Sequence, residues 1–180
     1  MARLDYADLN RDEVRPLVER IVAERGSVLH LYQMLLHSAP VAQGWLNHLT
    51  GIRQQTVLPG DIREMVIMRI AYLNRAPYEA DQHAPIALKA GMSRAQLDAL
   101  RDGPLDRVFD ERERAVLAYT DAMTVDVQVS DEMFAAVKRH FEARELVELT
   151  ATIATYNMVS RFLEALHIHS DDARTCSEDP

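Results

Sequence analysis

The feature that most constrains the fold of this chain is the stretch 60–73, which would be apolar on nearly every side of a helix. Pro59 precedes it, and Asp61 is placed to act as an N-cap or as a first-turn acid. A helix with apolar side chains all round is usually buried in the middle of a domain. We therefore expect this helix to form the centre of the core.

A second helix is predicted to follow after a tight break at residues 74–77. Pro77 suits the first turn of that helix, where its missing N–H is no loss. Into this apolar region the sequence places four charged or titratable side chains: Glu64, Arg69, Glu79 and His83. These residues are the first candidates for a functional site.

Length and composition favour a single all-α domain built from helical hairpins. The chain has 180 residues, of which 48% are hydrophobic, so it can bury a sizeable core. Only 6 Gly and 7 Pro occur, and no convincing alternating run suggests a strand. Val125 to Val129 comes nearest and is better interpreted as a loop. The remaining helices are expected at about 11–25 (capped by Asn10), 27–37 (capped by Ser27), 40–51, 77–91, 95–100 (capped by Ser93), 110–123, 130–137 (capped by Ser130) and 144–166.

The expected organisation has three parts. Residues 1–9 form an N-terminal arm, residues 10–169 the helical domain with its motif region at 58–91, and residues 170–180 a polar C-terminal tail. The clearest loop, 101–104, is too short to separate two domains. The apolar character of the central helices favours a homo-oligomer, because such surface is often buried against copies of the same chain.

Charge and cysteine content exclude several classes of protein. The net charge of −8 without a basic run argues against nucleic-acid binding, and no Lys/Arg-rich amphipathic stretch suggests a membrane surface. No run of about 18 apolar residues and no signal-peptide core is present, so we expect a cytoplasmic protein. Cys176 is the single cysteine, which excludes an internal disulfide framework. It is expected to be an incidental exposed thiol, although oxidation or crosslinking would be open to it.

Glu79 and His83 stand at i, i+4, so they would lie one turn apart on one face of a helix. A carboxylate beside an imidazole raises the pKa of the histidine or holds its tautomer, as a proton-transfer site requires. The alternative is an exposed helical ion pair worth a few tenths of a kcal/mol. Spacing alone favours that alternative.

These residues resemble the carboxymuconolactone decarboxylase-like superfamily, which includes the alkylhydroperoxidase AhpD branch. That branch carries a Glu, then Cys-x-x-Cys twelve residues later, then x-x-x-His; here the Glu and His fall on Glu64 and His83. The two cysteine positions hold Ala76 and Glu79, so both redox thiols are absent. The decarboxylase branch lacks the cysteines and has Glu-x-x-x-His, which Glu79 and His83 match.

The resemblance extends over roughly residues 14–168, and the segments 112–120 and 144–162 look like the later helices of the family. It implies an AhpD-like helical fold, a trimer or hexamer, and no cofactor. The implied activity is a lyase or other proton transfer on a small carboxylated or lactone substrate. It favours the functional interpretation of the motif residues over the structural one.

In that interpretation His83 is the general acid/base, Glu79 orients it, and Glu64 is a second proton carrier whose pKa is raised by burial. The alternatives are a structural histidine bonded to a helix end and an ion pair of Glu64 with Arg63 or another arginine.

Four further side chains are expected to contact substrate: Arg69, Tyr78, Gln82 and Trp45. Arg69 could grip a substrate carboxylate bidentately, but a buried arginine paired with an acid of another helix is as plausible. Tyr78 and Gln82 could equally be interface or surface residues.

Weaker candidates lie near the end of the chain. Asn157 and Arg161 share a helical face and could cap neighbouring helices as readily as touch a ligand. His167 and His169 with nearby acids could suggest a metal, but no second ligand set at zinc spacing accompanies them.

Two rivals to the lyase hypothesis remain. A thiol hydroperoxidase is disfavoured by Ala76 and Glu79. A non-catalytic helical oligomer that binds a small ligand would gain weight if Glu64, Glu79 and His83 were exposed to solvent or bonded only to each other. A closed apolar pocket around them with a few polar groups would favour the enzyme.

Overall fold

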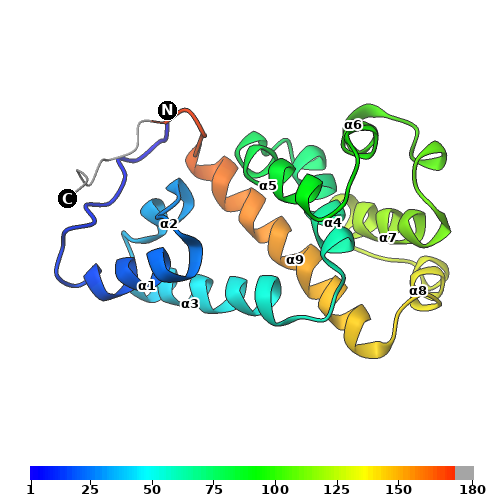
Figure 1. Cartoon of the computed structure of the whole chain (residues 1–180), viewed down its shortest axis with the longest axis horizontal. Helices are drawn as coiled ribbons and strands as arrows, with labels where there is room; N and C mark the ends of the chain where they lie inside the picture. Colours follow the sequence, from blue (N-terminus) through cyan, green and yellow to red (C-terminus); the bar gives the residue numbers. More distant parts are fainter. Residues whose placement is uncertain (173–180) are drawn as a thin grey trace. The chain divides into compact units, whose positions relative to one another are not determined.

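The computed structural model describes residues 1–172, and all regular elements among them are helical, as the sequence predicted (Figure 1). Cys176 and most of the predicted tail lie outside the described residues. The α-helices are α1 Arg15–Arg25, α2 His30–Leu35, α3 Ala39–Thr50, α4 Gly60–Leu73, α5 Pro77–Lys89, α6 Arg94–Asp102, α7 Glu111–Asp121, α8 Asp131–Lys138 and α9 Ala143–Leu166. Single π turns occupy Gly51–Gln55 and Ala122–Asp126, and a short 3₁₀ helix occupies Leu105–Arg107.

Several predicted helix starts are confirmed by side-chain caps. Ser93 and Asp110 form capping boxes with Gln96 and Glu113, and Ser130 accepts a hydrogen bond from the N–H of Met133. Each cap satisfies backbone donors that the first turn of a helix would otherwise leave without partners. Pro77 lies in the first turn of α5 and Asp61 in the first turn of α4, as expected.

Two predicted caps were wrong. Helix α1 begins at Arg15 rather than after Asn10, since a proline is tolerated only in the first turn and Pro16 fixes that turn. Helix α2 begins at His30 rather than after Ser27. Gly26 ends α1 in a left-handed conformation, with φ 83°, and the chain stays extended as far as Leu29.

The chain divides into two compact units, and the first comprises residues 1–54 together with the segment from Leu163 onward. It holds α1, α2 and α3. Its N-terminal residues are bonded to the end of the described chain: the N–H of Arg3 donates to the carbonyl of Leu166 at 2.9 Å, and the Tyr6 hydroxyl donates to Asp172 at 2.6 Å. The segment predicted to be an arm is therefore anchored within this unit.

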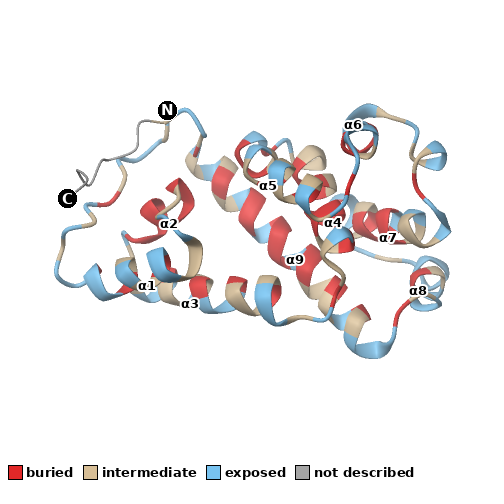
Figure 2. Cartoon of the chain, viewed as in Figure 1, coloured by how far each residue is buried: buried red, intermediate tan, exposed pale blue. Residues whose placement is uncertain are grey.

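The second unit, Gln55–Phe162, is built around α4. Helices α5, α6 and α7 all pack against α4, and α8 packs against α7. Eight of the fourteen residues of α4 are buried, on every side of the helix (Figure 2). The prediction that residues 60–73 form the centre of the core is confirmed.

Most of α9 also belongs to this second unit and links its parts. Its Glu148 accepts hydrogen bonds from the N–H groups of Val57 and Leu58, which lie just before α4. Its Thr150 bonds to the hydroxyl of Tyr119 on α7 at 3.0 Å. Buried and exposed positions alternate along α9 in Figure 2, so one side of the helix faces the core.

Candidate functional site

The centre of the site is a hydrogen bond between Glu64 on α4 and His83 on α5. Nδ1 of His83 lies 2.7 Å from Oε2 of Glu64, and the two side chains are 7% and 1% exposed. The Nε of Arg63 approaches the other oxygen of Glu64 at 3.4 Å. The pair is buried because α4 is apolar on all sides and α5 packs directly along it.

This contact determines which ring nitrogen of His83 can exchange protons. When Glu64 is ionised its oxygen accepts the hydrogen bond from Nδ1, and Nε2 is then the ring nitrogen that can gain or lose a proton. The ring of Tyr156 on α9 stands edge-on to the imidazole, with 5.1 Å between centroids and an interplanar angle of 89°. The imidazole is thus held by a carboxylate and packed against an aromatic ring.

A second buried carboxylate, Glu79 in the first turn of α5, bonds to α9. Its Oε2 is hydrogen-bonded to the hydroxyl oxygen of Ser160, and that hydroxyl lies 2.9 Å from the carbonyl of Tyr156. Glu79 is 2% exposed and Ser160 is 0% exposed. Three helices therefore bring two carboxylates, an imidazole and a hydroxyl into the interior of one unit.

The structure places a different carboxylate at Nδ1 of His83 from the one that the spacing indicated. The i, i+4 spacing predicted that Glu79 orients His83, whereas the carboxylate bonded to Nδ1 is that of Glu64. Glu79 instead meets Ser160, which the sequence analysis did not single out. Ser160 is one of four Ser or Thr residues on α9, with Thr150, Thr152 and Thr155, so no signal in the sequence distinguishes it. The orienting role of Glu79 stays a prediction.

Arg69 has structural partners rather than an open guanidinium. Its Nε and Nη2 donate to the two carboxylate oxygens of Asp121 on α7 at 2.8 and 2.7 Å. Its Nη1 donates to the carbonyl of Leu100 at 2.7 Å. The hydrogen bonds to Asp121 raise the pKa of Arg69 above its ordinary value. Arg69 therefore forms an ion pair with an acid of another helix, the alternative that the sequence analysis gave to binding of a substrate carboxylate.

The remaining predicted contact residues are placed differently from one another. Tyr78 is buried in the first turn of α5, and Gln82 is half-buried one turn later. Trp45 is half-buried on α3, in the first unit. Their assignment to substrate binding stays a prediction.

Asn157 and Arg161 form a structural network, the capping alternative raised from sequence. The amide nitrogen of Asn157 lies 3.0 Å from Thr124, and its oxygen accepts from Asn74 at 3.0 Å and from Arg161 at 2.6 Å. These bonds join the end of α4, the π turn after α7 and α9 within the second unit.

A pocket of about 620 Å³ opens beside the break between α4 and α5. Arg75 and Ala76 line it, together with Arg101 from α6. Arg75 holds a left-handed backbone conformation, with φ 54°, which is uncommon for a residue with a side chain. Arg101 pairs with Asp98 and Asp102, whereas the guanidinium of Arg75 forms no ion pair with any of residues 1–172. Arg75 is therefore the cation at this pocket best placed to receive an anion.

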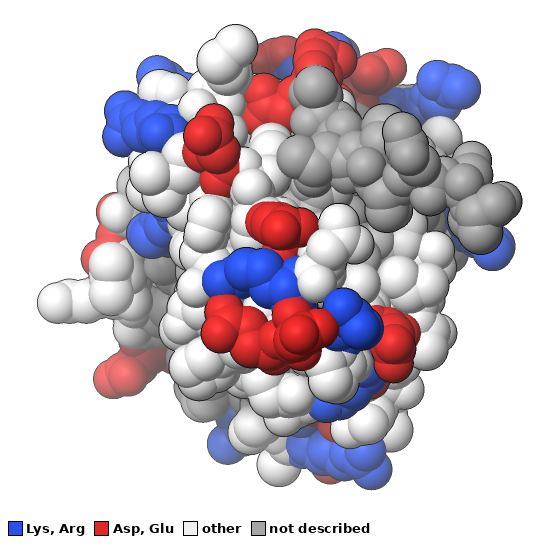
Figure 3. Space-filling view, turned by 90° about the vertical axis from the view of Figure 1, so that its left-hand side faces the viewer, with Lys and Arg blue, Asp and Glu red and all other residues white. Residues whose placement is uncertain are grey.

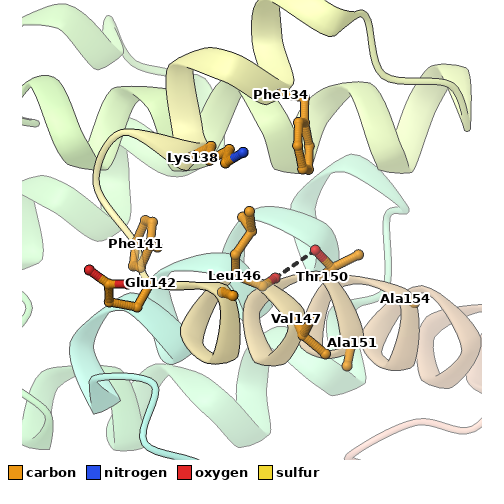
Figure 4. A pocket seen from close by; sticks show the side chains of 10 residues that line it. Phe134, Lys138, Phe141, Glu142, Leu146, Val147, Thr150, Ala151 and Ala154 are labelled. Atoms are coloured by element: carbon orange, nitrogen blue, oxygen red, sulfur yellow. Dashed lines mark hydrogen bonds between the residues drawn. The ribbon is translucent and has the colours of Figure 1, made fainter.

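A larger groove, of about 840 Å³, runs between α8 and α9 (Figure 4). Its walls are mainly apolar, with Phe134 and Phe141 opposite Leu146 and Val147. Figure 4 shows the Lys138 ammonium above Leu146. None of the residues that line this groove or the pocket at Arg75 belongs to the Glu64–His83 cluster.

The described residues hold no group of three His, Cys, Asp or Glu side chains arranged to bind a metal ion. The rings of His167 and His169 lie 6.2 Å apart without a third such ligand among residues 1–172. None of the described helices is long and apolar enough to cross a bilayer. On the face drawn in Figure 3, acidic and basic side chains are interspersed.

The fold and the site define an all-helical protein with a buried carboxylate–imidazole pair at its centre, and comparison with known proteins identifies its family. The model of the carboxymuconolactone decarboxylase family matches residues 39–122. The uncharacterized protein YnjA of Escherichia coli (strain K12) is 32% identical over 127 residues, or 69% of this chain. The chain spans 66% of that relative, slightly less than two thirds of its length.

Solved structures show the same fold. An AhpD-core, peroxidase-related protein from Ralstonia eutropha JMP134 superposes with a TM-score of 0.80 at 18% identity, covering 95% of this chain and 93% of the other. The debrominase Bmp8, in complex with 2,3,4-tribromopyrrole, gives a TM-score of 0.76 at 17% identity, covering 93% and 92%. The family-model match and the shared fold support membership of the carboxymuconolactone decarboxylase/AhpD-like superfamily.

Proposed function

We propose that the protein is a cofactor-independent lyase or related proton-transfer enzyme acting on a small carboxylated or lactone substrate. The observation that carries the proposal is the buried hydrogen bond between Glu64 and His83. An imidazole held at Nδ1 by a carboxylate is oriented, and the negative charge stabilises the imidazolium that forms when Nε2 takes a proton.

In a decarboxylation, the bond between the substrate carbon and its carboxylate breaks and CO₂ leaves. The electron pair passes into a conjugated carbonyl group and forms an enolate. Nε2–H of the His83 imidazolium then gives its proton to carbon, and His83 regains a proton before the next turnover. One proton is consumed for each CO₂ released.

Arg75 replaces Arg69 in this proposal as the substrate-binding cation. The guanidinium of Arg69 is engaged by Asp121 and Leu100, whereas Arg75 lines an open pocket next to Ala76 at the start of α5. A guanidinium binds a carboxylate through two parallel hydrogen bonds. The pocket volume also falls within the usual range for small-molecule sites.

Two alternatives are less well supported. Thiol-dependent hydroperoxide reduction requires the redox pair that the AhpD branch carries, and this chain has Ala76 and Glu79 at those positions. A non-catalytic ligand-binding oligomer remains the second alternative. Self-association stays a prediction, for which the exposed Phe134 and Val147 beside the α8–α9 groove are the candidate surface.

The test is decarboxylation of 4-carboxymuconolactone, followed by its ultraviolet absorbance, for the wild type and His83→Gln. We expect turnover by the wild type and a loss of about 10²- to 10⁴-fold in His83→Gln, the usual contribution of a general acid/base. The matched control is His140→Gln, a histidine in the turn after α8, which should retain full activity. Full activity of His83→Gln would remove His83 from the mechanism, and inactivity of the wild type on this and related carboxylated lactones would contradict the lyase assignment.

A further inference from the structure

The hydroxyl of Ser160 has two neighbours and a single proton to give. One neighbour is the carbonyl oxygen of Tyr156, one turn earlier on α9, and the other is Oε2 of Glu79. A carbonyl oxygen can only accept a hydrogen bond, whereas a carboxyl group accepts when ionised and donates when protonated. The direction of the Ser160 hydrogen bond therefore decides the protonation state of Glu79.

The hydroxyls on the helices of this chain use such a proton in two ways. Thr50 on α3 donates to the carboxylate of Glu24 at 2.6 Å. Thr120, Thr150, Thr152 and Thr155 each donate to the carbonyl one turn earlier, at 2.6 to 2.8 Å. This is the usual bond of a Ser or Thr inside a helix. Ser160 lies one turn after Tyr156, as these four threonines lie one turn after their acceptors. We therefore place its proton in the bond to the Tyr156 carbonyl.

Thr150 provides an internal comparison for the second neighbour. Its hydroxyl donates to the carbonyl of Leu146 and also lies 3.0 Å from the hydroxyl of Tyr119, which has a proton of its own to donate. At Ser160 the group in the position of Tyr119 is the carboxyl of Glu79. If Glu79 were ionised, the hydroxyl of Ser160 would have to donate its proton to Glu79. The hydroxyl oxygen of Ser160 and the carbonyl oxygen of Tyr156 would then lie 2.9 Å apart without a proton between them.

Burial acts in the same direction. Glu79 is 2% exposed, and removal of a carboxylate from water favours its neutral form. The other buried titratable side chains of α4, α5 and α9 are Glu64, Tyr78, His83 and Tyr156. An ionised Glu64 would further favour a neutral Glu79, whereas the first turn of α5 and a protonated His83 would favour its ionised form. The dipole of a helix end is a small effect beside the loss of hydration of a fully buried charge.

We infer that Glu79 is a neutral carboxylic acid near neutral pH, held by Ser160, and that it stores the proton which the reaction consumes. It lies one turn before His83 on α5, the spacing at which helical side chains meet. After His83 has protonated the substrate carbon, the O–H of Glu79 returns a proton to the imidazole, and Glu79 is reprotonated from solvent. The transfer of the Glu79 proton to His83 rests on the proposed function, whereas the protonation state of Glu79 does not.

Infrared difference spectroscopy of the full-length protein without substrate tests this state. Between about pH 6 and pH 8, where ordinary carboxyl groups are ionised, the wild-type-minus-Glu79→Gln spectrum should contain one protonated-carboxyl band that shifts in heavy water. The control is Glu148→Gln, because the described partners of Glu148 are all donors: Arg144, Val57 and Leu58. Its difference spectrum should contain carboxylate bands only.

Carboxylate bands in the Glu79→Gln difference spectrum would overturn the proposal. Ser160→Ala keeps the acid and removes its acceptor, so it provides a second measurement if Glu79→Gln does not fold. The protonated-carboxyl band should then move to higher frequency, and an unchanged band would also overturn the proposal. Because no substrate is involved, these results stand apart from failure of the lyase assay.

Discussion

Helix α4 carries a buried charged residue, Glu64, and a half-buried one, Arg69, and the fold surrounds them in different ways. Arg69 uses three nitrogens in three hydrogen bonds to Asp121 and Leu100. Its guanidinium stays protonated over the accessible pH range. Glu64 meets His83, whose charge can change near neutral pH. The two residues lie five positions apart, which points them to well-separated faces of the helix.

This difference distinguishes a charged pair that stabilises the fold from one that can take part in proton transfer. The Arg69–Asp121 pair has fixed protonation and geometrically complete bonding, so it fixes α7 against α4. The Glu64–His83 pair leaves a ring nitrogen whose proton can be exchanged. Burial and a charged partner are therefore insufficient to identify a catalytic site, and the capacity of the pair to change its protonation is the better criterion.

The largest expected effect on stability is that of Arg69→Met. Removal of the guanidinium leaves Asp121 and the Leu100 carbonyl without these partners, which should lower the free energy of unfolding by about 3 kcal/mol. Urea denaturation measures this loss, and the activity per folded molecule should be retained.

Arg75→Gln is the matched counterpart of Arg69→Met. Its stability should change by less than about 0.5 kcal/mol, because Arg75 is exposed and forms no ion pair with the described residues. The KM should rise by about tenfold, the effect of losing about 1.4 kcal/mol of substrate binding. If Arg69→Met instead raised KM without loss of stability, the assignment of the two arginines would have to be exchanged.

The next effect is that of Glu64→Gln on catalysis. The amide oxygen can still accept from Nδ1 of His83, but the charge that stabilises the imidazolium is lost, so kcat should fall by about 100-fold. Steady-state kinetics of Glu64→Gln, His83→Gln and the double variant measure the coupling. The double variant should be little worse than His83→Gln, and a loss equal to the product of the two single effects would show that the residues act independently.

The sequence was sufficient to predict the buried central helix. The continuous apolar run of α4 predicted it, and Glu64 is buried together with the apolar residues around it. The break at residues 74–77 and the proline that follows it predicted the start of α5. These features depend on neighbours along the chain, which the sequence displays directly.

The partners inside the site could not be predicted in the same way. The i, i+4 rule gives the spacing of Glu79 and His83 but not the rotation of α5 against α4 and α9, which directs Glu79 to Ser160 and Nδ1 of His83 to Glu64. The role of Arg69 depended on Asp121, a residue three helices further along the chain. Tertiary packing determines these choices, and one sequence leaves them open.

The smallest expected effect concerns Glu148, a carboxylate whose described partners resemble those of neither Glu64 nor Glu79. Burial alone would raise the pKa of Glu148, but hydrogen bonds from Arg144 and from the N–H groups of Val57 and Leu58 lower it below its ordinary value. A carboxyl whose pKa is lowered by folding stabilises the fold above its unfolded-state pKa, and this contribution disappears as the pH falls through the folded-state pKa.

Glu148→Gln should therefore cost about 1 kcal/mol near neutral pH, the value of a charge-assisted hydrogen bond that is partly exposed. The difference from the wild type should shrink as the pH falls through the lowered pKa of Glu148, because protonation of Glu148 weakens the same bonds in the wild type. Thermal unfolding at several pH values measures both quantities. Glu79→Gln should show no such dependence over this range if Glu79 is already neutral, so equal pH dependence of the two variants would remove the distinction between an ionised Glu148 and a protonated Glu79.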